Sequence, residues 1–249
     1  MATNILEVVR PGERANFQGR AVANKILLAI ANREFRAMRA QLEFVDLPAR
    51  FGLHEPGEKM EFAYFPNSGM VSLVVVASDG RTVEVGVVGN EGMACLPGAV
   101  YLHRSPLREV VQIAGEGFRI HVRELQQLLQ SFPQLNAQLT RYAVLHGMQV
   151  SQTAACNRLH DIRQRLARWL LMAQDRVDSG LLQITHDFLA TMLGTDRPSV
   201  SLAAGFLQKQ EAISYLRGAV QILNRKRLES FACECYSVMQ QFNGCLGIK

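Results

Sequence analysis

The order of hydrophobic and polar residues changes texture several times along the chain. Residues 21–45 place apolar side chains among Arg and Glu, which predicts an amphipathic helical start. From Leu47 to Ile120 the apolar residues form short Val-rich runs between Gly, Pro and Asp, and Thr82–Val87 alternates at period two. Asp79-Gly80 is a hairpin signal between two such runs. Many short strands with frequent turns predict a β-sandwich or barrel.

Helical patterns follow this β-region. Val122–Leu129 predicts a short helix, residues 134–158 a long one, and Leu166–Met172 a further apolar helix. The long helix approximates a heptad-like repeat that Gln149 and Gln152 interrupt. Two interpretations are open, namely a seam between two copies of the helix or packing on its own β-domain. The apolar positions of the repeat are Leu135, Leu139, Tyr142, Leu145, Met148, Ala155 and Leu159.

The segment 184–223 carries the most specific pattern. Thr185 is a good N-cap, and Gly194 ends a first short helix. A second helix begins at once, capped by Thr195 or Asp196, and bears small and apolar residues at i, i+3, i+4 and i+7. Two short helices across a glycine-containing turn describe a helix-turn-helix.

This motif presents the N-terminal residues of its second helix to base edges in the major groove of DNA. Arg197 is the long donor there, and an arginine–guanine pair is the commonest specific contact. Hydroxyl groups beside it can serve a phosphate or a base, while Asp196 is interpreted as the helix cap. The candidate DNA-binding residues, including one on the wing described next, are Thr195, Asp196, Arg197, Ser199, Ser201 and Arg217.

The chain after the helix-turn-helix predicts a wing and a last helix. Ile213–Tyr215 and Val220–Ile222 are β-prone runs that flank Arg217-Gly218, which places Arg217 at the tip of a two-stranded wing. A final helix is expected over residues 224–242. The basic triplet Arg225–Arg227 at its start either faces phosphate or is a solvated helix start.

Charge and composition change this picture only a little. The net charge is +5, and residues 146–249 hold 12 Lys and Arg against 8 Asp and Glu, so the basic bias falls on the half with the helix-turn-helix. No apolar run approaches the roughly 18–20 residues that span a bilayer. Residues 1–20 contain no apolar signal segment, so a cytoplasmic protein without a membrane partner is expected.

The cysteines number five, an odd count that makes a disulfide framework unexpected. Cys233 and Cys235 are one residue apart, which is not the C-x₂₋₄-C spacing of common zinc sites. A thiol redox sensor and buried, unreactive thiols are both open, and the pattern favours the second because Cys235 fits the apolar stripe of the final helix. The full set is Cys95, Cys156, Cys233, Cys235 and Cys245.

Several short motifs together resemble one protein family. They are Glu55–Glu58 with Tyr64–Pro66 and Gly69 in the β-region, Asn157-Arg158-Leu159 through Arg165-Leu166-Ala167 after the long helix, and Leu193–Val200 in the helix-turn-helix. On these the chain resembles the Crp/Fnr family of bacterial transcription regulators over nearly its whole length. The resemblance implies an α+β fold in three parts. These are a cyclic-nucleotide-binding-like β jelly roll with an N-terminal helix at 1–133, a connecting and dimerisation helix at 134–158, and a winged helix-turn-helix at 159–249.

The resemblance also implies partners and an effector site. The expected partners are double-stranded DNA, a second copy of the chain and RNA polymerase. Cyclic-AMP-binding relatives use a Gly-Glu pair and an Arg-Ser pair, for which this chain offers Gly89–Gly92 and Arg104–Pro106. An extra residue splits the first pair, and Pro106 removes a backbone N–H from the second, so a cyclic nucleotide is not the favoured effector. The candidate effector-binding residues are Glu91, Arg104, Ser105 and Ser151; the blander interpretation makes Glu91 and Arg104 surface or ion-pair residues.

Other chemistry finds little support in the sequence. Residues 1–94 contain no Cys, which disfavours the iron–sulfur branch of the family, and no His stands in a pattern that selects it as a haem ligand, so no cofactor is identified. The chain has no H-x-H metal motif, nucleophile elbow or phosphate loop, so an enzyme is not expected.

We therefore expect a homodimeric, sequence-specific DNA-binding transcription regulator, controlled allosterically through its jelly roll. The alternative is a ligand- or partner-binding sensor module that has lost specific DNA binding. Leu202 and the modest net charge of +4 over residues 146–249 support that alternative slightly. Relatives with the best-known operator have Glu and Arg where this chain has Pro198 and Leu202, so that operator sequence is not transferred.

Overall fold

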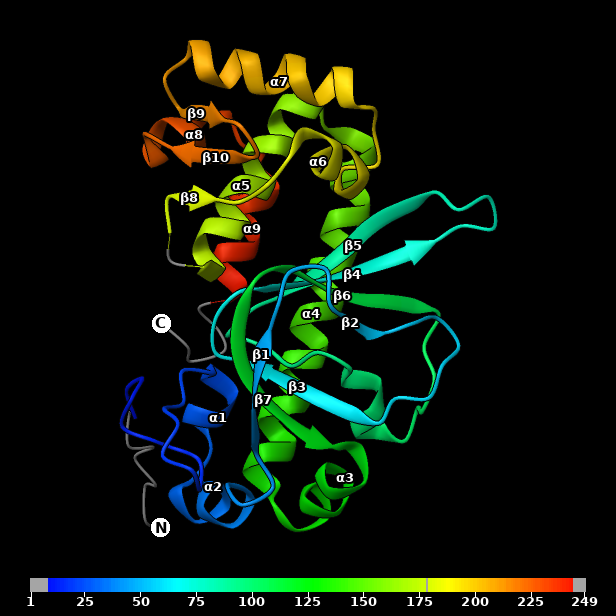
Figure 1. The fold of residues 1–249 in the computed structure, drawn as a ribbon, viewed down its shortest axis with the longest axis vertical. Coiled ribbons are helices and arrows are strands. Elements are labelled where there is room, and N and C mark those ends of the chain that lie inside the picture. The colour runs from blue at the N-terminus through cyan, green and yellow to red at the C-terminus, as the bar shows by residue number, and fades with distance from the viewer. Residues whose placement is uncertain (1–8, 178, 244–249) are drawn as a thin grey trace. The chain divides into compact units, whose positions relative to one another are not determined.

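The computed structural model describes residues 9–177 and 179–243 and divides the chain into two compact units (Figure 1). Of the described residues, the first unit holds 9–71 and 88–144, and the second holds 72–87, 145–177 and 179–243. The fold is α+β, with a β-rich N-terminal part, a long helix and a helix-rich C-terminal part, as the sequence predicts. Cys245 lies outside the described residues.

The N-terminal part of the first unit differs from the prediction. The amphipathic helical start predicted over 21–45 is confirmed for two short helices, α1 (Lys25–Ala29) and α2 (Asn32–Met38), but wrong from Glu43 onward, where the chain forms strand β1 (Glu43–Leu47). Ile30 and Ala31 break the helix because both adopt extended backbone, with ψ of 162° and 146°. Neither residue is Gly or Pro, so the break left no signal in the sequence.

Antiparallel strands follow in the first unit. β7 (Gly115–His121) lies between β1 and β3 (Phe62–Pro66), and Phe118 pairs with Phe44 on one side and Phe65 on the other. β2 (Gly52–His54) pairs with β6 (Leu107–Ile113). The Phe65 and Phe118 side chains are fully buried and centre the core of this unit.

Helices complete this unit. They are the 3-10 turn η1 (Leu96–Val100), α3 (Val122–Ser131) and α4 (Pro133–Leu159), which continues into the second unit. The predicted short and long helices are thus confirmed. The first apolar positions of the long helix, Leu135, Leu139 and Tyr142, are buried within the chain, so this stretch packs on its own domain.

The second unit begins with an inserted hairpin. β4 (Met70–Val76) and β5 (Thr82–Val88) are neighbouring strands, and the predicted turn at Asp79-Gly80 is confirmed. Gly80 adopts a φ of +81°, and its N–H donates to the Ala77 carbonyl at 2.9 Å. Positive φ costs glycine little, which explains its place in the turn.

The helical part of the second unit follows in the order α5 (Ile162–Val177), β8 (Leu181–Leu182), α6 (His186–Met192), α7 (Arg197–Lys209), β9 (Ile213–Leu216), β10 (Ala219–Ile222), α8 (Arg225–Phe231) and α9 (Glu234–Asn243). β10 lies between β8 and β9, and the predicted wing is confirmed as the β9–β10 hairpin. The single final helix predicted over 224–242 is wrong, since Ala232 adopts extended backbone and separates α8 from α9. No helix among the described residues is long and apolar enough to cross a membrane.

Candidate nucleic-acid interface

Helix α6, the first helix of the motif, is capped at both of its ends. The Thr185 hydroxyl accepts the Phe188 N–H at 3.2 Å and starts α6. Gly194 ends it at a φ of +58°, with Thr195 N–H donating to the Ala190 carbonyl at 2.9 Å and Gly194 N–H to Thr191. This pair of bonds is a Schellman motif, which stops a helix and turns the chain sharply. The predicted N-cap and glycine stop are confirmed.

The second helix starts at the residue favoured for its cap. One carboxylate oxygen of Asp196 accepts the Ser199 N–H at 2.8 Å, and the other accepts the Ser199 hydroxyl at 3.0 Å. The bond from the Ser199 backbone lowers the pKa of Asp196, so the cap is ionised at neutral pH. Pro198 stands in the first turn, where its missing N–H leaves no bond unmade.

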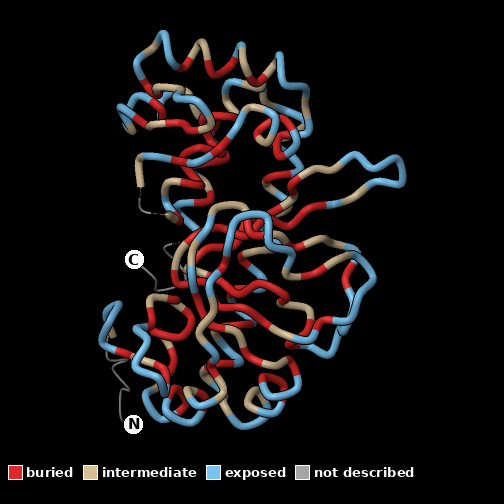
Figure 2. The backbone as a smooth tube through the Cα atoms, in the orientation of Figure 1, coloured by how far each residue is buried: buried red, intermediate tan, exposed pale blue. Residues whose placement is uncertain are grey.

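The two faces of α7 differ sharply in burial (Figure 2). The predicted apolar stripe is confirmed, with its side chains almost completely buried: Val200, Ala203, Ala204 and Leu207. On the opposite face Arg197 is exposed and Leu202 is 78% exposed. The small residues of the stripe hold the helix close to its neighbours, so its outer face is presented by a rigid support.

Arg197 extends from the first turn of α7. Its side chain is 64% exposed, and its nearest ionic partner is Asp187 of α6, with 3.5 Å between Nη1 and Oδ2. An exposed pair of this length contributes little to stability and is easily exchanged for another acceptor. The guanidinium is therefore available to a base or phosphate.

A contact that the sequence did not reveal lies beside it. The Ser201 hydroxyl is 3.0 Å from His186 Nδ1, and the His186 ring lies 4.0 Å from the ring of Tyr215 on β9. Burial, and then Arg197, lower the pKa of His186, so this imidazole is neutral at pH 7. These three residues join α6, α7 and the wing. Periodicity gave no signal for this contact, because it joins three separate elements.

The remaining candidate DNA-binding residues lie in the α6–α7 turn, in the first turn of α7 and in the wing. Thr195 and Ser199 are half-buried in the turn and in the first turn of α7. Arg217 is exposed in the wing turn, where Gly218 adopts a φ of +78°. Arg197 of α7 and Arg217 of the wing are thus both exposed within one unit.

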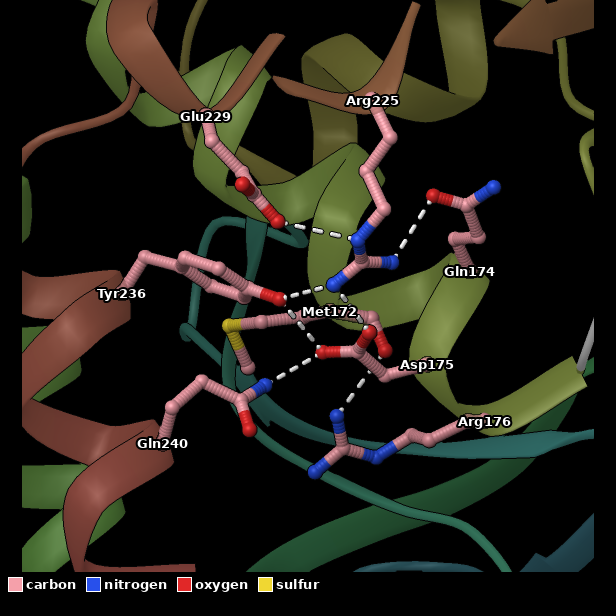
Figure 3. A network of polar contacts seen from close by, with 8 residues as sticks. All are labelled: Met172, Gln174, Asp175, Arg176, Arg225, Glu229, Tyr236 and Gln240. Atoms are coloured by element: carbon pink, nitrogen blue, oxygen red, sulfur yellow. Dashed lines mark hydrogen bonds and ion pairs between the residues drawn. The ribbon is translucent and has the colours of Figure 1, made fainter.

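Within the basic triplet at the start of α8, Arg225 makes a set of contacts inside the protein (Figure 3). Its guanidinium contacts Asp175 Oδ1 at 2.7 Å, Glu229 Oε1 at 2.9 Å, Gln174 Oε1 at 2.9 Å and the Tyr236 hydroxyl. Tyr236 in turn donates to Asp175 at 2.9 Å. Arg225 therefore joins α5, α8 and α9, and is neither a phosphate-facing nor a merely solvated side chain.

A buried carboxylate connects the inserted hairpin to α5. Glu84 of β5 accepts the Trp169 indole N–H at 2.7 Å and the Ser72 hydroxyl. Burial raises the pKa of Glu84 to about 7 despite these bonds. The hairpin also lies close to the turn between α6 and α7. A Cβ atom added at Gly194 would lie only 3.1 Å from Val83 Cγ2.

The four candidate effector-binding residues all have contacts within the protein. Glu91 accepts the Gly89 N–H at 3.2 Å, and Arg104 donates to the Gly57 carbonyl. The buried Ser105 accepts the Leu107 N–H at 3.1 Å, and Ser151 donates to the Gly147 carbonyl one turn back at 2.9 Å.

The first unit also contains a largely apolar pocket of about 750 Å³ that none of these four lines. It lies among η1, α3 and the start of α4. Tyr101, Gln126, Gln130, Asn136 and Thr140 are its polar lining residues.

The described residues thus hold a β-domain, a long helix and a winged helix-turn-helix in this order. Residues 164–231 match the family model of the Crp-like helix-turn-helix domain. The chain thus carries a Crp-like helix-turn-helix domain on the fold of the Crp/Fnr-family regulators, and the resemblance found in the sequence is confirmed.

Solved structures with this fold come from several bacteria. The chain is similar to a Crp/Fnr-family transcriptional regulator from Eubacterium rectale (15% identity over 81% of this chain and 94% of that chain, TM-score 0.64). It is also similar to FixK2 from Bradyrhizobium japonicum (16% identity over 77% of this chain and 98% of that chain, TM-score 0.62). A third similar structure is that of CLP, a c-di-GMP-responsive global regulator from Xanthomonas campestris (19% identity over 77% of this chain and 99% of that chain, TM-score 0.59). No curated protein matches the sequence.

Proposed function

We propose that this protein is a homodimeric, sequence-specific DNA-binding transcription regulator, controlled allosterically through its β-domain. The exposed N-terminal end of α7 is the observation that carries the proposal. Arg197 extends from a helix whose other face is fully buried, and one bidentate arginine–guanine pair is worth about 1–3 kcal/mol of discrimination. The supporting contacts to phosphates or bases come from Thr195, Ser199, Ser201 and Arg217, while Asp196 orients the helix.

The dimer is proposed to form on the outer face of α4. Val144 and Met148 are 55% and 46% exposed and stand one helical turn apart. Gly147 and Ser151 are exposed on the same face and allow a second helix to approach closely. This face shares Met148 with the predicted repeat but not its first members, Leu135, Leu139 and Tyr142, which are buried within the chain.

The proposed division of labour follows the boundaries expected from the sequence. Residues 1–133 sense a signal, residues 134–158 transmit it across the dimer, and residues 159–249 bind DNA. Two recognition helices would read half-sites about one helical turn of DNA apart, so a small rotation removes one set of contacts and much of the affinity. RNA polymerase is the proposed further partner, in the cytoplasm.

Selection from random DNA duplexes at two salt concentrations tests DNA recognition. We expect an enriched, roughly palindromic motif, affinity that falls as salt rises, and a roughly 10- to 100-fold loss for Arg197→Ala on that motif. Arg36→Ala, which removes an exposed arginine of α2, is the matched control and should bind as the wild type does.

The outcome also separates the alternative function. A stable dimer that enriches no motif, or an unchanged affinity in Arg197→Ala, would overturn DNA recognition and select the sensor module. The exposed Leu202 on α7 is the observation that favours this second candidate, because an apolar side chain suits a protein partner better than a DNA groove.

A further inference from the structure

Three cysteines and a histidine converge in the second unit. Cys156 and His160 lie one turn apart near the end of α4, and Cys233 and Cys235 flank the start of α9. Each offers one ligand atom, and these four atoms all lie within 4.8 Å of one another. The pairs are separated by more than 70 positions in the chain, and Cys233-x-Cys235 has no zinc spacing, so the sequence did not bring them together.

The distances within the cluster suit one tetrahedral ion. Cys156 Sγ and Cys233 Sγ are 3.4 Å apart, and Cys235 Sγ is 3.6 Å from His160 Nδ1. Zinc bonds of about 2.3 Å to sulfur and about 2.0–2.1 Å to nitrogen give a tetrahedron with edges of about 3.4–3.8 Å. Three thiols and one imidazole are also a donor set that structural zinc sites use.

The surroundings of the cluster complete the argument. The second nitrogen of His160, Nε2, lies 3.1 Å from the Glu234 carboxylate, as in the carboxylate–histidine–metal arrangement that orients ligating histidines. Gln152 donates to Cys235 Sγ at 3.0 Å. The three cysteines are buried, and the His160 side chain is only 13% exposed.

The charge of the neighbourhood also fits. Three thiolates with one Zn²⁺ carry a net charge of −1, and Arg165 and Arg168 both interact electrostatically with Cys156. A site built only of buried, idle thiols would not need a histidine held between a sulfur and a carboxylate.

We infer that Cys156, His160, Cys233 and Cys235 form a structural zinc site that fastens the α8–α9 junction to the end of α4. Binding releases the thiol protons to solvent, and His160 binds through neutral Nδ1 while its Nε2–H donates to Glu234. All four ligands come from the protein, so the site is closed and supports structure rather than catalysis.

Metal content of the full-length protein is the direct test. The protein is purified in reductant without chelator, and about one zinc per chain is expected by elemental analysis. Cys156→Ser and Cys235→Ser should each retain at least tenfold less zinc after dialysis. Cys95→Ser is the matched control, because Cys95 is also a buried free thiol but belongs to the first unit, and it should keep the wild-type content.

A second variant covers the case in which the cysteine variants fail to fold. Glu234→Gln keeps all four ligands and should weaken zinc binding by about 10- to 100-fold in competition with a chelator. Cobalt(II) added to the reduced apoprotein should give the intense thiolate-to-cobalt absorption of a tetrahedral site. Removing zinc should lower the melting temperature, because metal affinity is coupled to folding.

Three results would overturn the inference. One is a protein without zinc whose reduced form gives no thiolate-to-cobalt absorption. Another is stoichiometric iron in place of zinc. The third is a Cys156–Cys233 disulfide in the protein as isolated, which would show that the short sulfur–sulfur distance serves oxidation instead.

Discussion

Two helices of the second unit both begin with a cap residue followed by an arginine and use that arginine in opposite ways. α7 starts with the cap Asp196 followed by Arg197, and α8 starts with the cap Asn224 followed by Arg225. Arg197 is 64% exposed with one loose ionic partner, whereas Arg225 has four partners on α5, α8 and α9. The comparison shows that the cap sets where the helix starts, while the packing of the unit decides whether the arginine serves structure or recognition.

The largest expected effect concerns Glu84, whose carboxylate is buried more deeply than either arginine. Glu84→Gln keeps the shape and can donate to Ser72 while accepting from Trp169. The pKa of Glu84 is raised to about 7 in the folded state from 4.5, so its contribution to stability is complete below pH 4.5 and is lost as pH rises to about 7. Between pH 4.5 and 8, the unfolding free energy of the wild type should therefore fall by about 3 kcal/mol more than that of the variant.

Chemical denaturation of both proteins across this pH range measures the difference. Subtracting the two curves is necessary because Glu109, another buried carboxylate, also has a pKa of about 7. Parallel curves would show that Glu84 is already ionised in the folded protein at pH 5.

Arg225→Ala comes next. Its removal leaves Asp175 and Tyr236 without their cation, and an unpaired, partly buried network costs about 2 kcal/mol. Denaturation should show this loss, whereas Arg197→Ala in the same assay should change stability by less than about 0.5 kcal/mol. Equal losses in the two variants would erase the distinction between the two arginines.

The reciprocal experiment uses DNA. Arg197→Ala should lower affinity for the selected site by about 1–3 kcal/mol and relax preference at one base pair. Arg225→Ala, measured at a temperature where it remains folded, should bind the same duplex with wild-type preference. A greater loss of base preference in Arg225→Ala than in Arg197→Ala would reverse the assignment.

The smallest expected effect is at the cap itself. Asp196→Ala removes the acceptor for Ser199 and should lower stability by less than Arg225→Ala does. Because the pKa of Asp196 is lowered in the folded state, this contribution is present above the ordinary aspartate pKa and is lost as pH falls below it. Thermal unfolding at pH 7 and pH 3 should therefore show a smaller gap between the two proteins at pH 3.

Features with a local cause were predictable from the sequence. The stop at Gly194, the cap at Asp196 and the wing around Arg217-Gly218 each follow from a residue whose chemistry favours that conformation. Breaks at Ala31 and Ala232 were missed, because both residues adopt extended backbone without being Gly or Pro.

The candidate site residues also divide into those with a local signal in the sequence and those without one. Arg197 was predicted from its position in the motif, and the structure shows that its side chain is exposed. The Ser201–His186–Tyr215 contact and the cysteine–histidine cluster join elements that are distant in the chain. Spacing along the sequence carries no information about such pairs, so only the fold could reveal them.

The inserted hairpin has a consequence for how the chain is made. Residues 72–87 leave the ribosome well before α5, yet Glu84 and Val83 on this hairpin complete their contacts only with Trp169 and the turn at Gly194. The second unit is therefore discontinuous in sequence. During synthesis its first strands cannot complete their contacts until its later helices have been made. A fragment that starts after α4 lacks the hairpin and leaves the Trp169 indole N–H without its acceptor, so it is not an independent substitute for the unit.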